Sequence, residues 1–267
     1  MADEALRRRR DSFDEDPDNY QAARPSYPER VYQVLTECGL GPGARVLEVG
    51  PGTGQVTGHL VAAGASVVAV ELGPGLATRL RRNLADRDVT VIEGDFATVG
   101  VPGGGFDVAV CATSLHWLDA EVAVRRLAGL VRPGGWLVVW WTVFGDPERP
   151  APWRVGLDPL YQRWLPGQRR NPVPVPLRVA ERTAELETGG WFDLVGVEMI
   201  RWTHLLTPQR ARGLWGTFPN VRELDPDQRQ AFLHGVAEVI AGQPGGVAED
   251  HYVTALYTAR RRTDPAA

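Results

Sequence analysis

Lysine is absent from this sequence of 267 residues, so all 29 basic side chains are arginines. A lysine Schiff base, a lysine general base and the phosphate-binding lysine of a P-loop are therefore excluded. The formal net charge is −4, which gives no overall attraction to a nucleic-acid backbone. The one local exception is the arginine run at residues 7–10, which acidic residues follow at once. We interpret it as a solvated leader and expect no nucleic-acid partner.

Cysteine and long apolar runs are also scarce. The two cysteines, Cys38 and Cys111, stand far apart in the sequence, which argues against a disulfide framework and for a reducing compartment. No apolar stretch reaches the length of a membrane span, and no apolar segment follows the N-terminal arginines as a signal peptide would require. We therefore expect a cytoplasmic protein without a membrane partner.

Histidine is sparse and shows no metal-ligand pattern. Four of the five histidines share no spacing of the kind that metal ligands have; they are His59, His204, His234 and His251. We therefore expect no metal site.

Between residues 45 and 141, short β-branched runs alternate with amphipathic patterns of helical period. Strands are expected at residues 45–50, 66–71, 89–95, 106–113 and 136–141, and helices at 54–64, 75–85 and 119–131. Strict alternation of this kind predicts an α/β fold with a parallel, doubly wound sheet. The strands are almost continuously apolar because helices cover both faces of such a sheet.

The alternation stops after Trp141. Residues 144–178 are proline-rich and are expected to leave the sheet. A strand is expected at 197–206, helices at 207–218 and 225–242 with Thr207 and Asp225 as N-caps, and a closing strand at 251–261. We therefore predict a leader and cofactor-covering segment at 1–30, a nucleotide-binding core at 31–143, a helical and aromatic substrate lid at 144–250 that contributes the strand near 197–206, and a closing strand and tail at 251–267.

Three glycines follow the first expected strand directly. Gly50, Gly52 and Gly54 have the spacing G-x-G-x-G, whereas a dinucleotide-binding loop has G-x-G-x-x-G; Gln55 occupies the next position. Glycine lets a backbone approach a ligand closely and adopt positive φ. Taken alone, the motif fits either a ligand-binding loop or a tight strand-to-helix turn.

Acidic residues stand at the ends of the next two strands. Glu71 is placed to accept hydrogen bonds from ribose hydroxyls, and Asp95 with Phe96 suits an adenine amino group and ring. Each residue also has a purely structural interpretation: Glu71 as a helix N-cap, Asp95 as a turn former and Phe96 as a core side chain. Because the carboxyl ends of parallel strands meet at one edge of the sheet, the three strand ends together indicate a nucleoside site.

The chain resembles the class I S-adenosylmethionine (SAM)-dependent methyltransferases over about its first 140 residues. The stretches that carry the resemblance are "VLEVGPGTGQ" (46–55), "VAVELG" (68–73), "EGDF" (93–96), "FDVAVCATSLHWLD" (106–119) and "LVRPGGWLVVW" (130–140). The segment "YQAARPSYP" (20–28) is similar to the entry segment of the trans-aconitate methyltransferase-like (methyltransferase type 11) group. The resemblance implies SAM as cofactor and a Rossmann-like sheet of seven strands whose last strand is antiparallel.

The resemblance also implies roles for individual residues. Gly50, Gly52 and Gly54 would face the methionine part of SAM, Glu71 its ribose, and Asp95 and Phe96 its adenine. The backbone near Cys111 would hold the methionine amine. The cofactor site would further include Tyr20, Arg24 and Tyr27, which would close over SAM, and Glu48, Gln55, Leu72 and Ser114.

Acceptor chemistry is expected after the fourth strand. His116 is a candidate base for a phenol or activated alcohol, or else a structural or substrate-positioning residue. Trp117, Trp141 and Trp153 are candidate walls of a substrate pocket. Four arginines offer guanidinium groups for a carboxylate substrate instead; they are Arg24, Arg154, Arg201 and Arg212.

We therefore predict a SAM-dependent methyltransferase that acts on a hydroxyl of a small molecule. Carboxyl methylation of a small organic acid, N- or C-methylation, and a non-methylating SAM-binding protein or cyclase are the alternatives. The glycine spacing disfavours a nicotinamide oxidoreductase. No carboxylate ends the fourth strand, which disfavours metal-dependent methylation, and "CATS" replaces the NPPY-type signature of amino-methylating DNA enzymes.

Overall fold

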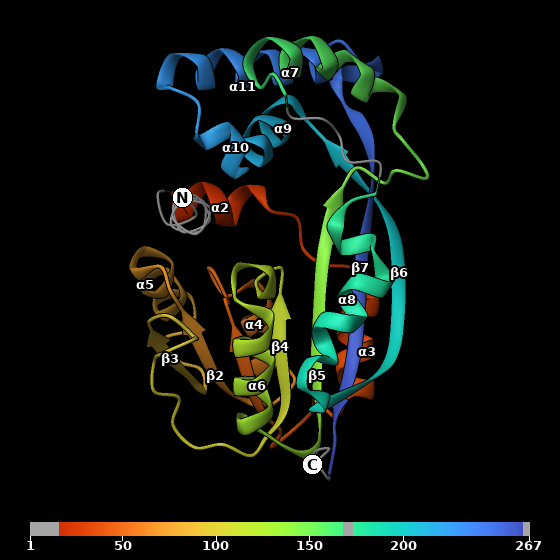
Figure 1. Ribbon diagram of the computed structural model, residues 1–267. Coiled ribbons are helices and arrows are strands. Elements are labelled where there is room, and N and C mark those ends of the chain that lie inside the picture. Colours follow the sequence, from red (N-terminus) through yellow and green to blue (C-terminus); the bar gives the residue numbers. More distant parts are fainter. Residues whose placement is uncertain (1–15, 168–172, 264–267) are drawn as a thin grey trace. The chain divides into compact units, whose positions relative to one another are not determined.

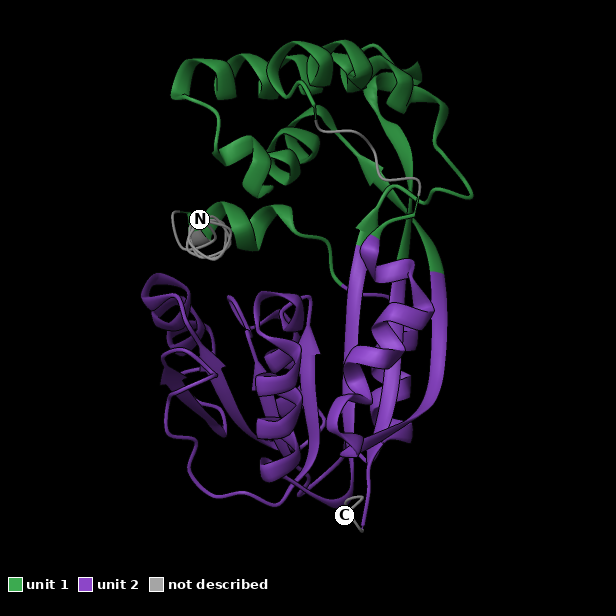
Figure 2. Cartoon of the chain, in the orientation of Figure 1, with its two compact units in different colours: residues 1–26, 143–174, 201–253 green, residues 27–142, 175–200, 254–267 purple. Residues whose placement is uncertain are grey.

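A computed structural model describes residues 16–167 and 173–263 of the chain. The arginine run at residues 7–10 and the tail from residue 264 onward lie outside the described residues. The chain divides into two compact units (Figure 2). Unit 1 takes Met1–Ser26, Val143–Pro174 and Arg201–Val253, and unit 2 takes Tyr27–Thr142, Val175–Ile200 and Thr254–Ala267.

A seven-stranded sheet runs through the chain (Figure 1). Its strands are β1 (Arg45–Val49), β2 (Ser66–Glu71), β3 (Val89–Glu93), β4 (Phe106–Ala112), β5 (Val131–Phe144), β6 (Phe192–Leu206) and β7 (Ala248–Arg261). The strand order is β3-β2-β1-β4-β5-β7-β6, and the four pairs from β3 to β5 are parallel. The last strand, β7, lies between β5 and β6 and runs antiparallel to them. The predicted α/β, Rossmann-like sheet of seven strands is confirmed.

The helices of unit 2 flank this sheet. They are α3 (Glu29–Glu37), α4 (Gln55–Ala62), α5 (Pro74–Asn83), α6 (Ala120–Leu130) and α8 (Val179–Leu186). Short 3₁₀ turns are η2 (Leu115–Trp117), η4 (Val175–Leu177) and η5 (Thr188–Gly190). Among the residues described, in either unit, no helix combines the length and the apolar character needed to cross a bilayer.

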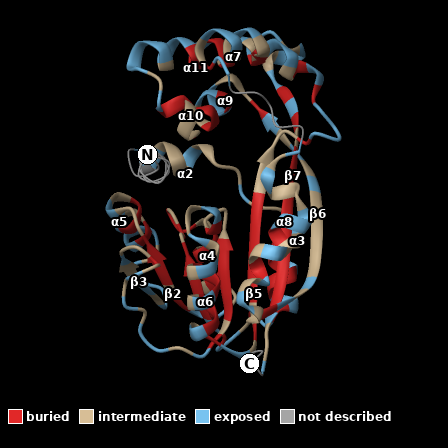
Figure 3. Cartoon of the chain, viewed as in Figure 1, coloured by how far each residue is buried: buried red, intermediate tan, exposed pale blue. Residues whose placement is uncertain are grey.

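The core of unit 2 has two layers because successive side chains of a strand point to opposite faces. On β1, Val46 faces the layer built with α3, α4 and α5, and Leu47 faces the layer built with α6 and α8. The central strands are accordingly buried along their length (Figure 3). Cys38 and Cys111 are free thiols, one in each layer.

Strand β5 begins earlier than expected. The sequence predicted a turn at "RPGG" and a strand that starts only at residue 136. Strand β5 begins at Val131, and its register with β4 shifts between Phe106 and Val108. A Cβ added at Gly135 would lie 2.7 Å from a Val131 methyl group and 2.9 Å from the Asp107 carbonyl oxygen. The two strands are thus paired through a bulge that the missing side chain allows.

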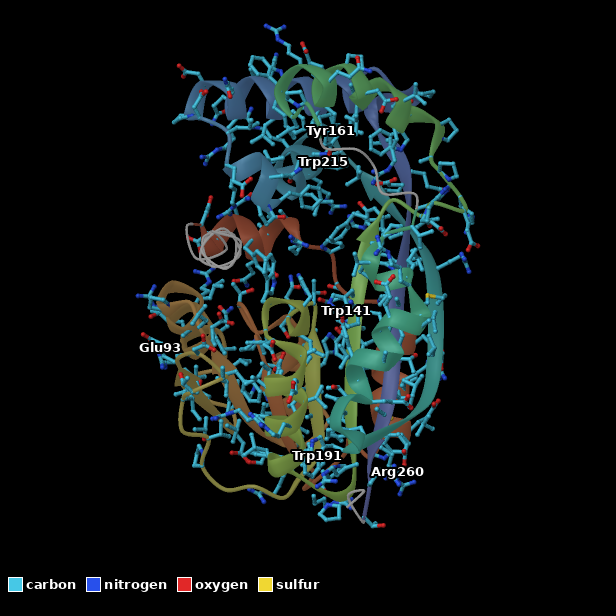
Figure 4. The ribbon with its side chains drawn as sticks, in the orientation of Figure 1. Glu93, Trp141, Tyr161, Trp191, Trp215 and Arg260 are labelled. Atoms are coloured by element: carbon cyan, nitrogen blue, oxygen red, sulfur yellow. The ribbon has the colours of Figure 1, made fainter. Side chains whose placement is uncertain are left out.

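Unit 1 has a separate aromatic core. Its helices are α2 (Pro17–Ala23), α7 (Asp158–Trp164), α9 (Pro208–Trp215), α10 (Pro219–Arg222) and α11 (Pro226–Ala241), with 3₁₀ turns η3 (Pro152–Leu157) and η6 (Pro244–Gly246). Trp153, Trp215 and Phe232 are central to its core cluster. Side chains of Tyr161 and Trp215 point toward each other (Figure 4), and the Trp215 indole donates to the Tyr161 hydroxyl at 3.0 Å.

The predicted caps of α9 and α11 are confirmed. The Thr207 hydroxyl accepts from the Arg210 N–H, and the Asp225 carboxylate accepts from the Gln228 N–H at 3.0 Å.

Asp225→Ala is expected to lower the free energy of unfolding by about 1 kcal/mol, because it leaves an N-terminal amide of α11 without its acceptor. Chemical denaturation would measure the loss. Asp227→Ala is the matched control: Asp227 lies in the same first turn, and its charge contributes only through the helix dipole. Equal losses in the two variants would contradict the capping assignment.

Candidate functional site

The loop after β1 is a tight turn that only glycine accommodates at its first position. Gly50, Gly52 and Gly54 have φ of +72°, +60° and +93°. A Cβ at Gly50 would lie 2.5 Å from the Cβ of Ser114, whose hydroxyl donates to the Val49 carbonyl oxygen. The ends of β1 and β4 are therefore held against each other, and Gln55 opens α4 directly behind the loop.

Glu71 connects the end of β2 to this loop. One carboxylate oxygen accepts from the Gly52 N–H and the other from the Gly73 N–H, each at 2.9 Å, and the residue is 6% exposed. Leu72 follows it, half-buried. The acidic group is thus fixed in place at the junction of two strand ends.

At the end of β3, Asp95 and Phe96 have different environments. Asp95 accepts from the Ala97 N–H at 2.9 Å, which shapes the turn. The Phe96 ring is 3% exposed within the core, and the Arg126 guanidinium lies 5.2 Å from its centroid. Of the two side chains, Asp95 is the less buried one in this structure.

Glu48 is an acidic group enclosed completely by protein. It lies on the same face of β1 as Val46, toward α4, and is 0% exposed. Within residues 16–167 and 173–263, neither its carboxyl oxygens nor the Thr57 hydroxyl has a partner at hydrogen-bonding geometry. Burial raises the pKa of Glu48 to about 8; the nearby Thr57 hydroxyl lowers it in part, and the charge of Glu71 raises it.

The backbone directly after β4 is strained. Thr113 has φ of +57°, which is uncommon for a β-branched residue. Its hydroxyl and that of Tyr27 are 3.3 Å apart, and the Tyr27 ring meets Trp140 edge-on at 5.5 Å. Tyr27 was predicted as a site residue from the sequence but Thr113 was not, because no residue pattern indicates a positive φ at a threonine. Strain of this kind is concentrated at functional sites.

His116 lies in η2, next to two tryptophans. The Trp141 indole N–H donates to His116 Nδ1 at 2.9 Å, and the Trp117 ring centroid lies 4.4 Å from the imidazole. The residue reaches solvent on one side. The surrounding protein still displaces enough water from the ring to lower the pKa of His116 to about 4, and the positive charge of Arg182 acts in the same direction.

The remaining predicted residues fall into two groups. Cys111 is buried at the end of β4, where burial raises the pKa of its thiol to about 12. Tyr20, Arg24 and Trp153 belong to unit 1 and not to unit 2. There the Arg24 guanidinium lies 5.1 Å from the Phe144 ring centroid, and the Trp153 indole donates to the Glu249 carbonyl oxygen at 2.9 Å. Their place in a cofactor or substrate site stays a prediction.

Most of the arginines considered for a carboxylate substrate have partners within unit 1. Arg154 forms two hydrogen bonds to Asp250, at 2.7 and 2.6 Å, and Asp250 is 0% exposed. Arg201 pairs with Asp146 at 3.0 Å and with Glu148, and Arg212 donates to Gln230. The guanidinium groups of these three arginines therefore have hydrogen-bond partners within the protein and need no ligand to satisfy them.

Comparisons with known proteins agree with this arrangement. Residues 47–139 match the family model described as a methyltransferase domain. The chain is 25% identical over 232 residues to an uncharacterized methyltransferase-like protein of Schizosaccharomyces pombe, covering 86% of each chain. It is 29% identical over 191 residues to an uncharacterized methyltransferase of Mycobacterium bovis, covering 71% of this chain and 69% of the relative.

A solved structure shares the fold. The SAM-dependent methyltransferase of Thiobacillus denitrificans, in complex with S-adenosyl-L-homocysteine, aligns with a TM-score of 0.54 at 17% identity. The alignment covers 90% of this chain and 94% of that one.

Proposed function

We propose that this chain, which is a class I SAM-dependent methyltransferase, methylates a hydroxyl oxygen of a small molecule. The observation that carries the choice of a hydroxyl is the pairing of the arginines. Arg154 and Arg201, two of the four arginines considered for a carboxylate substrate, are bound to Asp250 and Asp146 of the chain itself. Trp117 and Trp141 beside His116 support an apolar, planar acceptor.

The residues at the strand ends fit SAM. Glu71 would accept the ribose hydroxyls, the glycine loop would face the methionine part, and Asp95 would accept from the adenine amino group. In the part of the chain that the structure describes, the carboxyl oxygens of Glu48 and the hydroxyls of Thr53 and Thr57 are buried without hydrogen-bond partners. Such atoms are rare in folded proteins, and SAM carries hydroxyl and ammonium donors. The orphaned groups around the loop therefore support a ligand of this kind.

When bound, SAM supplies a methyl group on a positively charged sulfur, and the sulfur keeps the electron pair of the broken bond as oxygen bonds to carbon. The chain then has to hold the acceptor oxygen in line and exclude water, and positioning of this kind lowers a barrier by several kcal/mol. We assign that positioning to His116, Trp117 and Trp141, and we keep the interpretation of residues 144–250 as a substrate lid.

Carboxyl methylation is the second candidate. A carboxylate needs no base, and the Nδ1 atom of His116 already accepts from Trp141. The resemblance of residues 20–28 to the trans-aconitate methyltransferase-like group supports the same reading. We place either reaction in the cytoplasm, which the two free thiols support.

Ligand binding tests the cofactor assignment. Purified protein is expected to gain thermal stability with SAM and with S-adenosylhomocysteine but not with NADH. A ligand present at about 100 times its Kd adds about 2.7 kcal/mol to the free energy of unfolding. A response to NADH alone would overturn the proposal.

Label transfer from methyl-labelled SAM tests the acceptor class. A panel of small phenols and small carboxylic acids is expected to give labelled phenyl ethers in preference to labelled esters. Labelled esters alone would favour the second candidate. Labelled amines alone, or complete conversion with intact SAM, would rule out both.

A further inference from the structure

We propose that Trp141 fixes His116 as a neutral hydrogen-bond donor, so that His116 orients an acceptor oxygen that is already anionic instead of removing its proton. The inference rests on the proposed methyl transfer to oxygen and names the ionisation state of the substrate. Trp141, labelled in Figure 4, lies on β5, and His116 lies in the turn that follows β4. The two strands are neighbours in the sheet.

The hydrogen bond between these residues decides which ring nitrogen of His116 carries the proton. An indole N–H can only donate. Because Trp141 Nε1 donates to His116 Nδ1 at 2.9 Å, Nδ1 must present its lone pair. In a neutral imidazole the proton then resides on Nε2. His116 therefore has no lone pair left with which to accept a proton from a substrate.

The surroundings of the pair hold this arrangement. Trp141 is 3% exposed, and its ring contacts Tyr257 of β7 edge-on, with the centroids 5.8 Å apart. Among the described residues, the charged and titratable groups next to the pair are Arg182 of α8, its ion-pair partner Glu185, and Tyr257 of β7. The Arg182 guanidinium lies 5.7 Å from the Trp141 centroid and pairs with Glu185.

Protonation of His116 is doubly unfavourable here. It would place an N–H on Nδ1 directly against the indole N–H, and it would add a positive charge near Arg182. Both effects agree with the direction of the pKa shift at His116, which is downward. The imidazole is thus neutral throughout the physiological pH range.

The donor that His116 offers selects the acceptor. The residue is exposed, and its Nε2 has no hydrogen-bond partner among the described residues. An N–H donor binds an anionic oxygen more strongly than a neutral hydroxyl. The substrate class is therefore an acidic hydroxyl, of the phenol or enol type, or a carboxylate. Its proton leaves to solvent before transfer, and the oxygen lone pair forms the bond to the methyl carbon.

Nitrogen NMR tests the fixed tautomer without any substrate. In protein labelled with ¹⁵N-histidine, long-range ¹H–¹⁵N spectra are expected to show His116 with a protonated Nε2 and an unprotonated Nδ1 down to pH 5. The His116→Gln spectrum assigns the signal. In Trp141→Phe, which removes the donor and keeps an aromatic ring, the two tautomers should mix and the imidazole should titrate at higher pH than in the wild type.

A matched variant controls for the loss of one indole from the same strand. Trp136→Phe changes a β5 tryptophan that stacks with Arg260 and is expected to leave the His116 signals unchanged. A protonated Nδ1 in the wild type would overturn the inference, and so would identical titration of His116 in wild type and Trp141→Phe. The wild-type spectrum decides the tautomer even if Trp141→Phe does not fold.

Kinetics with two phenols of different acidity test the consequence for the substrate. The midpoint of the pH profile of kcat/KM should follow the pKa of the phenol, and His116→Gln, which keeps an N–H donor, should retain kcat within about tenfold. A general base would instead give one midpoint for both phenols and a loss of roughly 10²- to 10⁴-fold in His116→Gln. Absence of methylation with every oxygen acceptor would refute the proposed function, whereas the NMR result would still decide the tautomer.

Discussion

Glu71→Ala is expected to abolish most of the binding of SAM and S-adenosylhomocysteine. The carboxylate is held by the amides of Gly52 and Gly73, so it would meet the ribose hydroxyls without reorganisation. Hydrogen bonds to a charged group contribute about 1.5 to 3 kcal/mol each, and two of them correspond to a loss of roughly a hundredfold or more in affinity. Isothermal titration calorimetry would measure the change.

Two further variants separate binding from folding. Glu71→Gln keeps the size of the side chain and should also bind weakly, because its amide nitrogen would face the N–H of Gly52 or Gly73. Glu93→Gln is the matched control: Glu93, labelled in Figure 4, is the register partner of Glu71 on β3 and contacts Arg81 at the surface. Unchanged affinity in both Glu71 variants would remove the ribose assignment.

Glu48→Gln is expected to be more stable than the wild type at alkaline pH. The pKa of Glu48 is raised by burial from 4.5 to about 8. Up to pH 4.5 the carboxyl is protonated in both states; above it the unfolded state loses its proton while the native state keeps it. Stability is therefore fully present below pH 4.5 and is lost as pH rises toward 8, by several kcal/mol for a shift of this size.

Denaturation of wild type and Glu48→Gln at a series of pH values would measure this effect. The two proteins should be similar below pH 4, where the carboxyl is largely protonated in the folded and the unfolded state and is therefore as neutral as the amide. At pH 9 the variant should be the more stable one. Parallel stability curves across this range would contradict the assignment of a neutral Glu48 in the folded chain.

The positions of the strand ends could be predicted from the sequence because they depend on local pattern. The alternation of apolar runs and helical patterns placed Gly50, Glu71 and Asp95 at the carboxyl ends of β1, β2 and β3, and the structure has them there. The burial of Phe96 in the core was considered as an alternative, but the pattern alone did not decide it.

Contacts between residues that lie far apart in the chain could not be predicted from the sequence. The hydrogen bond between Trp141 and His116 joins β5 to the turn that follows β4, and nothing in either segment specifies which tryptophan contacts the imidazole. Arg154 and Asp250 are 96 residues apart in the sequence, and no local pattern predicts that their side chains form an ion pair. Helix α3 was missed because its apolar positions, Val31, Val34 and Leu35, follow a proline-bounded segment that we assigned to a leader.

The division into two units has a consequence for the gene. The chain passes from one unit to the other at residues 26/27, 142/143, 174/175, 200/201 and 253/254. Neither unit is therefore encoded by one contiguous stretch of codons, and no truncation or single exchange of a coding segment can deliver one complete unit without part of the other. Replacing unit 1 by that of a related gene would require the exchange of three separate coding segments, for residues 1–26, 143–174 and 201–253.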